Sequence, residues 1–227
     1  TANAYKAIAI SGLALQGTHA SRYSVQAPSD VVGTVTQASH STSGIVVVAR
    51  AYDGTRTATI NSTNYAFAGV FGSDAVVLDA SNYGALYDTA TASTSKSVTV
   101  SALALSGTDA ANYTLVQPML VGAINKATAT VIFSTPLSVV YDATSRAVGT
   151  TTTPSALTVV VQYSGRGATS FATSTTGPID AGSYGVAASI NETNYLGTNA
   201  ADFTIEKQVL PVALETAALT TTFTGRA

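Results

Sequence analysis

The chain has 227 residues, of which only 10% are charged, and its formal net charge at pH 7 is −2. This weakly acidic balance excludes the basic field that nucleic acids and anionic membranes attract, so neither is an expected partner. No run of about 18 apolar residues occurs, so this segment is not expected to insert into a membrane. Cysteine is absent, which favours a bacterial exterior over a disulfide-rich animal one.

Short runs rich in valine, isoleucine, threonine and tyrosine follow one another, each closed by glycine, asparagine, aspartate or serine. Residues 45–49 are uniformly apolar and predict a buried strand, whereas residues 97–105 alternate with period two. Further strands are predicted at residues 157–163, 184–190 and 202–205. Many short strands at regular spacing predict an all-β chain built from β-sandwiches.

An internal repeat divides the chain into units. Residues 11–23 (SGLALQGTHASRY) return as residues 101–113 (SALALSGTDAANY), at an offset of 90 residues. A period of this length suits a string of small domains and is too long for a solenoid. The last strand of each unit leads almost directly into the next unit, so we expect a semi-rigid, elongated rod. The predicted units are 1–38 (partial), 39–126, 127–208 and 209–227 (partial).

Two copies of a D-A-[AG]-x-Y motif precede late strands, from Asp109 to Tyr113 and from Asp180 to Tyr184. Their position predicts a tyrosine corner, in which the phenol bonds back to nearby backbone. The aspartate is expected to cap the turn through its own backbone. A catalytic carboxylate–phenol pair is the alternative, although nothing nearby in the sequence supplies it with a partner.

Two turns share a Tyr-Asp pair, Tyr52-Asp53-Gly54 and Tyr141-Asp142. Asp53-Gly54 predicts a hairpin turn of type I′, because both central positions of that turn need positive φ. Ala143 replaces the glycine in the second copy, so a different turn is expected there. A ligand-binding role for the two aspartates is the alternative.

No catalytic, cofactor or metal site is expected. His19 and His40 lack the spacing of metal ligands, and the carboxylates lack the dense pattern of a calcium loop. A single interdomain calcium site stays open as an alternative. So does a Lys–Asn isopeptide staple at Lys126 or Lys207. No phosphate-binding loop and no histidine suited to a nucleophilic triad are present.

Residues 39–126 resemble a YDG domain, through YDGT at 52–55 and the late pattern from Val100 to Leu115. Residues 1–38 resemble the end of a preceding YDG copy, in which His19 and Arg22 replace an aspartate and an asparagine.

Residues 127–208 resemble an MBG domain, a mostly bacterial immunoglobulin-like fold, and residues 209–227 resemble the first strand and turn of another. The segments that carry the MBG resemblance are Tyr141-Asp142, 151–154 (TTTP), 180–184 (DAGSY) and 191–195 (NETNY). The expected fold class is therefore all-β, with tandem immunoglobulin-like β-sandwiches arranged as an elongated rod.

This resemblance implies large secreted or surface-anchored proteins of Gram-negative bacteria, often filamentous-haemagglutinin-like adhesins, and it implies no catalytic residues. The leading prediction is a stalk or fibre segment of an adhesin or extracellular filament. One alternative is a module that binds carbohydrate or a host surface through exposed tyrosines of the 39–126 unit, with Tyr83 and Tyr87 as the platform. Core packing is the competing interpretation of those rings.

The other alternative is a self-assembling fibre subunit joined by strand exchange of its incomplete ends. Its partners would be neighbouring repeat units of the same or adjacent chains.

Overall fold

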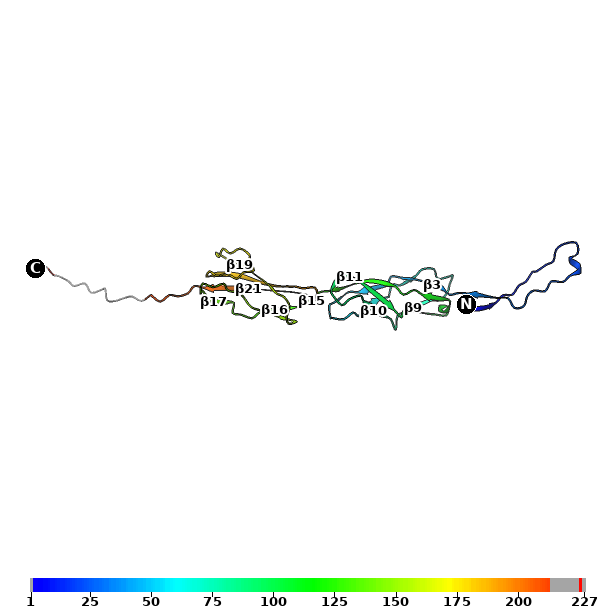
Figure 1. The fold of residues 1–227 in the computed structure, drawn as a ribbon, viewed down its shortest axis with the longest axis horizontal. Helices are drawn as coiled ribbons and strands as arrows, with labels where there is room; N and C mark the ends of the chain where they lie inside the picture. The colour runs from blue at the N-terminus through cyan, green and yellow to red at the C-terminus, as the bar shows by residue number, and fades with distance from the viewer. Residues whose placement is uncertain (1, 213–224, 226–227) are drawn as a thin grey trace. The chain divides into compact units, whose positions relative to one another are not determined.

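The computed structural model describes residues 2–212 and 225, drawn in colour in Figure 1. The chain divides into two compact units, Thr1–Ala127 and Thr128–Ala227. In the described part, regular structure consists of β-strands and two short 3-10 helices, so the prediction of an all-β fold is confirmed. No helix in that part is long and apolar enough to cross a membrane. The rod arrangement stays a prediction.

The first unit contains fourteen strands and both 3-10 helices. They are β1 (Asn3–Ala7), η1 (Ala20–Arg22), β2 (Val32–Val35), β3 (Ala38–His40), β4 (Thr42–Ser43), β5 (Val46–Val48), β6 (Arg50–Ala51), β7 (Thr59–Asn61), β8 (Ala66–Phe67), β9 (Val77–Asp79), β10 (Gly84–Tyr87), β11 (Ser93–Ser101), β12 (Ala104–Ser106), η2 (Ala110–Asn112), β13 (Tyr113–Leu115) and β14 (Met119–Asn125).

A four-stranded sheet of order β10-β11-β14-β6 organises the first unit. Its central strand β11 alternates as the sequence predicts, with Val98 and Val100 buried in the core. The predicted strand 97–105 is interrupted at Ala102, where φ is 57°, and pairing resumes in β12. Short two-stranded sheets, β12 with β9, β13 with β3, β4 with β8 and β5 with β7, complete the unit.

Strand β5 corrects one prediction, because residues 45–49 are not uniformly buried. Val46 is 56% exposed and Val48 is 46% exposed, while Ile45 belongs to the core and Val47 packs against it. Strand β5 pairs with β7 in a two-stranded sheet, and its alternating burial shows that one face packs on the core while the other faces solvent. A run of apolar residues at a sheet edge therefore imitates a buried strand.

The remaining strands form two sheets, one of order β15-β21-β20-β19 with β17 also paired to β21, and one in which β16 pairs antiparallel with β18. They are β15 (Ala127–Thr128), β16 (Thr130–Phe133), β17 (Ser138–Val140), β18 (Thr150–Thr153), β19 (Val160–Gly165), β20 (Gly182–Asn191) and β21 (Tyr195–Glu206). The rings of Tyr163, Tyr184 and Phe203 fill the core, with Phe203 6.2 Å and 6.3 Å from the two tyrosine centroids.

Two segments, 1–38 and 209–227, are predicted as partial units, and the structure describes nearly all of the first but little of the second. In the first, β1 pairs antiparallel with β2, and the loop between them carries η1. In the second, residues 209–212 form no strand, and residues 213–224, 226 and 227 lie outside the described residues. The prediction of an opening MBG strand at 209–227 therefore falls largely outside the described part.

Candidate functional site

In both units an early strand runs parallel to the end of the last strand. In the first unit β6 pairs with β14, so that Arg50 lies opposite Ile124 and Ala51 opposite Asn125. In the second unit β17 pairs with β21, and Val140 lies opposite Glu206. We call these two parallel pairings the terminal clasps.

The Tyr-Asp motif begins at the residue that directly follows the early strand of each clasp. The Tyr52 N–H donates to the Asn125 carbonyl at 2.8 Å, and the Tyr141 N–H donates to the Glu206 carbonyl at 2.8 Å. Both motifs therefore attach the early strand of a unit to the final residues of its last strand. The sequence identifies the motif but gives no sign of this long-range partner.

After the clasp of the first unit, the chain turns through Asp53 and Gly54. The Asp53 carboxylate accepts the Thr55 N–H and the Thr55 hydroxyl, each at 2.8 Å. Gly54 has a φ of 81°, whereas Asp53 is not in the left-handed region. The predicted type I′ turn is therefore wrong. The aspartate side chain closes the turn, so only one residue needs positive φ.

The second copy of the motif forms the same turn, which corrects the expectation of a different one. The Asp142 carboxylate accepts the Thr144 N–H at 3.1 Å and the Thr144 hydroxyl at 2.6 Å. Ala143 takes the place of Gly54 with a φ of 63°. A left-handed alanine costs roughly 1–2 kcal/mol, and the carboxylate bonds hold it there.

An arginine pairs with each of these aspartates, from opposite sides of the motif. Arg50 precedes Asp53 and lies 2.6 Å from it, whereas Arg146 follows Asp142 and lies 2.5 Å from it. Hydrogen bonds from Thr55, helped by Arg50, lower the pKa of the Asp53 carboxyl. The Thr144 hydroxyl bond is the main cause of the lowered pKa of Asp142. Both carboxylates are thus engaged by their own turn.

The first D-A-x-x-Y copy does not form the predicted tyrosine corner. The Tyr113 hydroxyl donates to the Asp74 carboxylate at 2.6 Å and accepts the Phe71 N–H at 3.2 Å. The bond to Asp74 is the main cause of the raised pKa of Tyr113. The Asp109 carboxylate does not cap its own turn and accepts the Ala75 N–H at 2.9 Å. This copy therefore holds a loop that lies far upstream in the sequence.

The second copy bonds locally. The Tyr184 hydroxyl donates to the Asp180 carbonyl at 2.6 Å, which is the geometry of a tyrosine corner. Burial is the main cause of the raised pKa of this phenol. The Phe171 ring meets the Tyr184 ring edge-on at 5.5 Å. The same motif therefore fixes a near carbonyl in one unit and a distant loop in the other.

The proposed aromatic platform is wrong, because its two tyrosines belong to the core. Tyr87 is 0% exposed, and its hydroxyl donates to the Ala123 carbonyl at 3.1 Å. Tyr83 is half-buried against the same core and accepts the Ile60 N–H at 3.3 Å. Core packing is the correct interpretation of both rings. Phe71, another ring of this unit, is 67% exposed.

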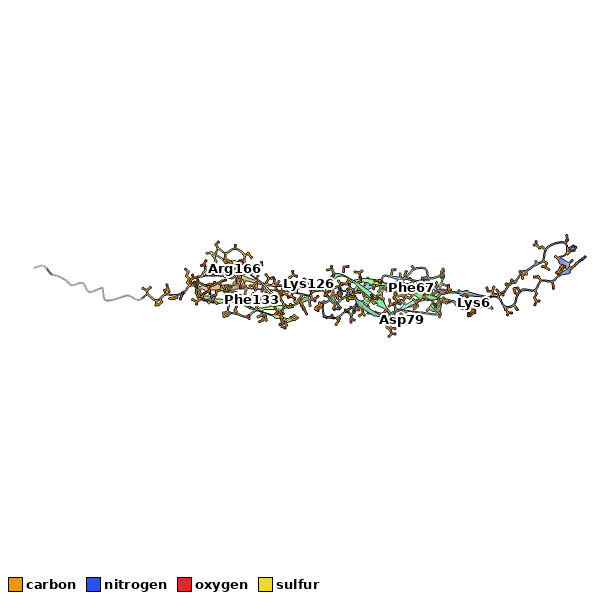
Figure 2. The ribbon with its side chains drawn as sticks, in the orientation of Figure 1. Lys6, Phe67, Asp79, Lys126, Phe133 and Arg166 are labelled. Atoms are coloured by element: carbon orange, nitrogen blue, oxygen red, sulfur yellow. The ribbon has the colours of Figure 1, made fainter. Side chains whose placement is uncertain are left out.

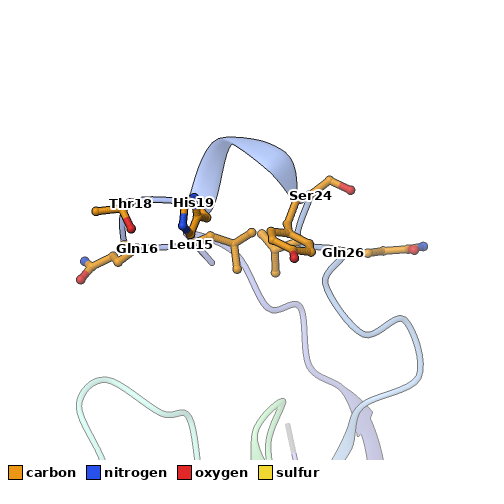
Figure 3. Close-up of a pocket in the computed structure, with 10 residues that line it drawn as sticks. Leu15, Gln16, Thr18, His19, Ser24 and Gln26 are labelled. Carbon is orange, nitrogen blue, oxygen red and sulfur yellow. The ribbon is translucent and has the colours of Figure 1, made fainter.

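The two histidines lie in unrelated places. His40 is buried beside the Tyr113 ring, at 4.7 Å between centroids, and its Nδ1 lies 2.5 Å from the Ala68 carbonyl. His19 is exposed and lines a hollow of about 620 Å³ in the loop between β1 and β2, together with Leu15 and Tyr23 (Figure 3). No group of three His, Cys, Asp or Glu residues that could hold a metal occurs among the described residues.

Comparison with known families agrees with the division of the chain into two compact units, which meet at Ala127 and Thr128. Residues 36–119 match the YDG domain and residues 127–209 match an MBG domain. No curated protein and no solved structure matches the chain. MBG domains are immunoglobulin-like β folds, and the two domain types in tandem fit an extracellular, adhesin-like protein.

Proposed function

Because the chain carries a YDG domain followed by an MBG domain, we propose that it is a structural stalk or fibre segment of a large secreted or surface-anchored bacterial adhesin or extracellular filament. The segment acts at the cell surface of a Gram-negative bacterium and performs no catalysis. Its partners are neighbouring repeat units. The observation that carries the proposal is the terminal clasp in each unit.

A clasp of parallel strands resists a pull on the ends of its unit. Tension draws the early strand and the last strand along their length in opposite directions, so the hydrogen bonds between them are strained together. An antiparallel hairpin pulled apart at its open end instead loses its bonds one after another. Parallel pairing of the end strands therefore suits a unit that transmits tension.

The second unit shows the bonds that such a pull would shear. The Thr204 N–H donates to the Leu137 carbonyl at 2.9 Å, and the Tyr141 N–H donates to Glu206. The Ser138 hydroxyl adds a bond to the Glu206 carboxylate at 2.7 Å. These contacts join residues near the start of the unit to residues at its end.

The first unit has a second parallel pairing besides its clasp. Strand β3 runs parallel to β13, with Ala38 opposite Tyr113, and the Val116 N–H donates to the His40 carbonyl at 2.8 Å. The start of the domain is thus attached to its late strands at two places. This redundancy supports a mechanical role. A glycan-binding role has less support, since the buried Tyr87 and the half-buried Tyr83 pack in the core and offer no platform.

Single-molecule stretching tests the proposal, and the absence of cysteine makes the attachment points selectable. Handles at Thr36→Cys and Gln208→Cys stretch both units along their natural ends. Handles at Val160→Cys and Ser189→Cys, which lie opposite each other in the antiparallel pair of β19 and β20, peel the second unit instead. We expect two unfolding events in the first geometry, each at a clearly higher force than the peeling event.

Natural-end unfolding at the same force as peeling would contradict the stalk proposal, because the clasps would then add no resistance. The control is thermal unfolding of each double-cysteine variant before the handles are attached, compared with that of the natural chain. The melting temperatures should be unchanged.

A further inference from the structure

The hairpin of residues 2–36 reproduces, in three dimensions, the second half of the first unit, residues 92–125. The first and last strands of each segment, β1 with β2 and β11 with β14, pair antiparallel with a register shift at the same place. The matching pairs are Asn3 with Val35 and Lys6 with Gly33 in the hairpin, and Ser93 with Ile124 and Lys96 with Gly122 in the unit.

The loops between these strands match as well. Gly17 and Gly107 have φ values of 112° and 104°, and each is followed by a 3-10 helix, η1 or η2. The residues that close these helices, Tyr23 and Tyr113, share a φ of −129° with ψ of 150° and 155°. The hairpin therefore shares with the second half of the first unit its strand register, its left-handed glycine and its 3-10 helix, whereas β12 and β13 have no strand counterparts in it.

The burial of the matching side chains is opposite. Ile8, Leu13 and Tyr23 are 47%, 47% and 73% exposed. Their counterparts in the first unit are Val98, Leu103 and Tyr113, which are 0%, 4% and 4% exposed. We call the face that carries Ile8, Leu13, Leu15 and Tyr23 the open face of the hairpin. An apolar face that is shaped for a core but lies open marks an interaction surface.

A lysine occupies the same position on both strands. Lys96 is 5% exposed and is held by the Asp88 carboxylate at 3.0 Å and the Thr89 hydroxyl at 2.5 Å. Lys6 on β1 is only half-buried, and no ion pair of Lys6 is found among the described residues (Figure 2). The open face thus also lacks the carboxylate that its lysine would need on burial.

The first unit shows what covers such a face. Strand β9 pairs with β12, β3 pairs with β13, and Asp74 binds Tyr113. These elements and Asp88 all belong to residues 38–91, which form the first half of the unit. The complement of the open face is therefore a first half of the same kind.

Residues 38–91 of the same chain cannot supply this complement. They already cover residues 92–125, and a second copy of the chain is occupied in the same way. Connectivity also forbids it: Ala38 pairs with Tyr113, whereas Asn125 pairs with Ala51, at the far end of β14. The seven residues of β14 span roughly 20 Å, and Gln37 alone cannot bridge that length between Thr36 and Ala38.

We propose that residues 2–36 act as the second half of a YDG-like unit, and that the open face binds a first half of the same kind as residues 38–91. In the first unit the first half passes into the second through Thr91-Ala92. The partner carries an apolar strand antiparallel to residues 14–16 and a carboxylate for Lys6. This inference stands apart from the stalk role, because any tandem array needs the same complement.

The test places a copy of residues 38–91 directly before Ala2, which recreates the natural Thr-Ala junction. A single cysteine at Leu13→Cys reports exposure by its rate of thiol labelling, with Leu103→Cys as the buried reference. In the fusion, labelling at position 13 should slow by at least about tenfold and approach the reference. A fusion whose added copy carries Leu78→Asp is the control and should label as fast as the unfused chain.

Equal labelling of position 13 in the fused and unfused chains would overturn the proposal. A second fusion with His19→Asp and Arg22→Asn restores the residues of the complete unit. If only that variant becomes protected, the natural hairpin does not accept a first half, and the proposal fails. Protection that rises with concentration in the unfused chain would assign the face to a second copy and would also overturn it.

Discussion

Lys96 and Asp88 form an ion pair of 3.0 Å in which the ammonium is buried and the carboxylate lies at the surface, 51% exposed. The Lys96 ammonium is also hydrogen-bonded to Thr89, so its charge is removed from water but not left alone. The pair joins the end of β10 to β11 in the four-stranded sheet.

Removal of the carboxylate should destabilise the first unit, because Asp88→Asn leaves a buried ammonium with only the threonine hydroxyl as partner. Replacement of the ammonium by Lys96→Met should be close to neutral, since an apolar side chain of similar volume fills the same space. Urea unfolding measures both, and the double variant gives the coupling between them. Asp88→Asn that is harmless in the natural background but harmful beside Lys96→Met would contradict this account.

The left-handed alanine of the second motif predicts a stabilising substitution. Ala143→Gly should raise the free energy of unfolding of the second unit by about 1 kcal/mol, because glycine adopts a φ of 63° without strain. Gly54→Ala should lower that of the first unit by a similar amount. Ala200→Gly, within the long pairing of β20 and β21, is the control and should be destabilising. A destabilising Ala143→Gly would show that its backbone is not strained.

Close packing over Gly122 predicts a large effect of a single methyl group. A Cβ at this position would lie 2.5 Å from Val47 Cγ1 and 3.2 Å from the Tyr87 ring, so Gly122→Ala should destabilise the first unit by about 1–3 kcal/mol. Val47→Ala in the same chain should recover part of the loss. Gly33, the matching residue of the hairpin, faces only the flexible end of Ile8 at 2.9 Å, and Gly33→Ala should have little effect.

Removal of the hydroxyl should cost a different amount of stability at each of the two tyrosines of the D-A-x-x-Y motif. Tyr184→Phe leaves the Asp180 carbonyl without one bond and should destabilise the second unit by about 1 kcal/mol. Tyr113→Phe removes one donated and one accepted bond and should be worse for the first unit. Hydrogen exchange at the Phe71 amide should rise in Tyr113→Phe alone. Equal exchange in both variants would contradict the assigned bond.

Acid should weaken both units through their motif aspartates. The pKa values of Asp53 and Asp142 lie below the ordinary 3.8 in the folded chain, because the threonine bonds favour the ionised form. Each group therefore contributes stability that is fully present above 3.8 and is lost as the pH falls through its lower folded pKa. Asp142→Asn should flatten the acid limb of a stability–pH curve for the second unit. An unchanged limb would show that the lowered pKa of Asp142 has no influence on folding.

The sequence by itself determined the features that depend on local pattern. The alternation of residues 97–101 placed Val98 and Val100 on one face of a strand. The 90-residue repeat identified residues 11–23 and 101–113 as two copies of one motif. These features follow from the two-residue period of a strand and from shared turn residues, and both can be read in a short window.

Only the tertiary structure decided which residues meet. Tyr87 is in the core because β10 places it there, although a tyrosine as a residue type suits the surface equally well. Tyr113 reaches Asp74 and Tyr184 reaches Asp180, because the loops that face each phenol differ between the units. The left-handed Ala143 is fixed by a carboxylate bond and not by its own preference. Partners distant in the chain depend on strand order and register, which no local pattern contains.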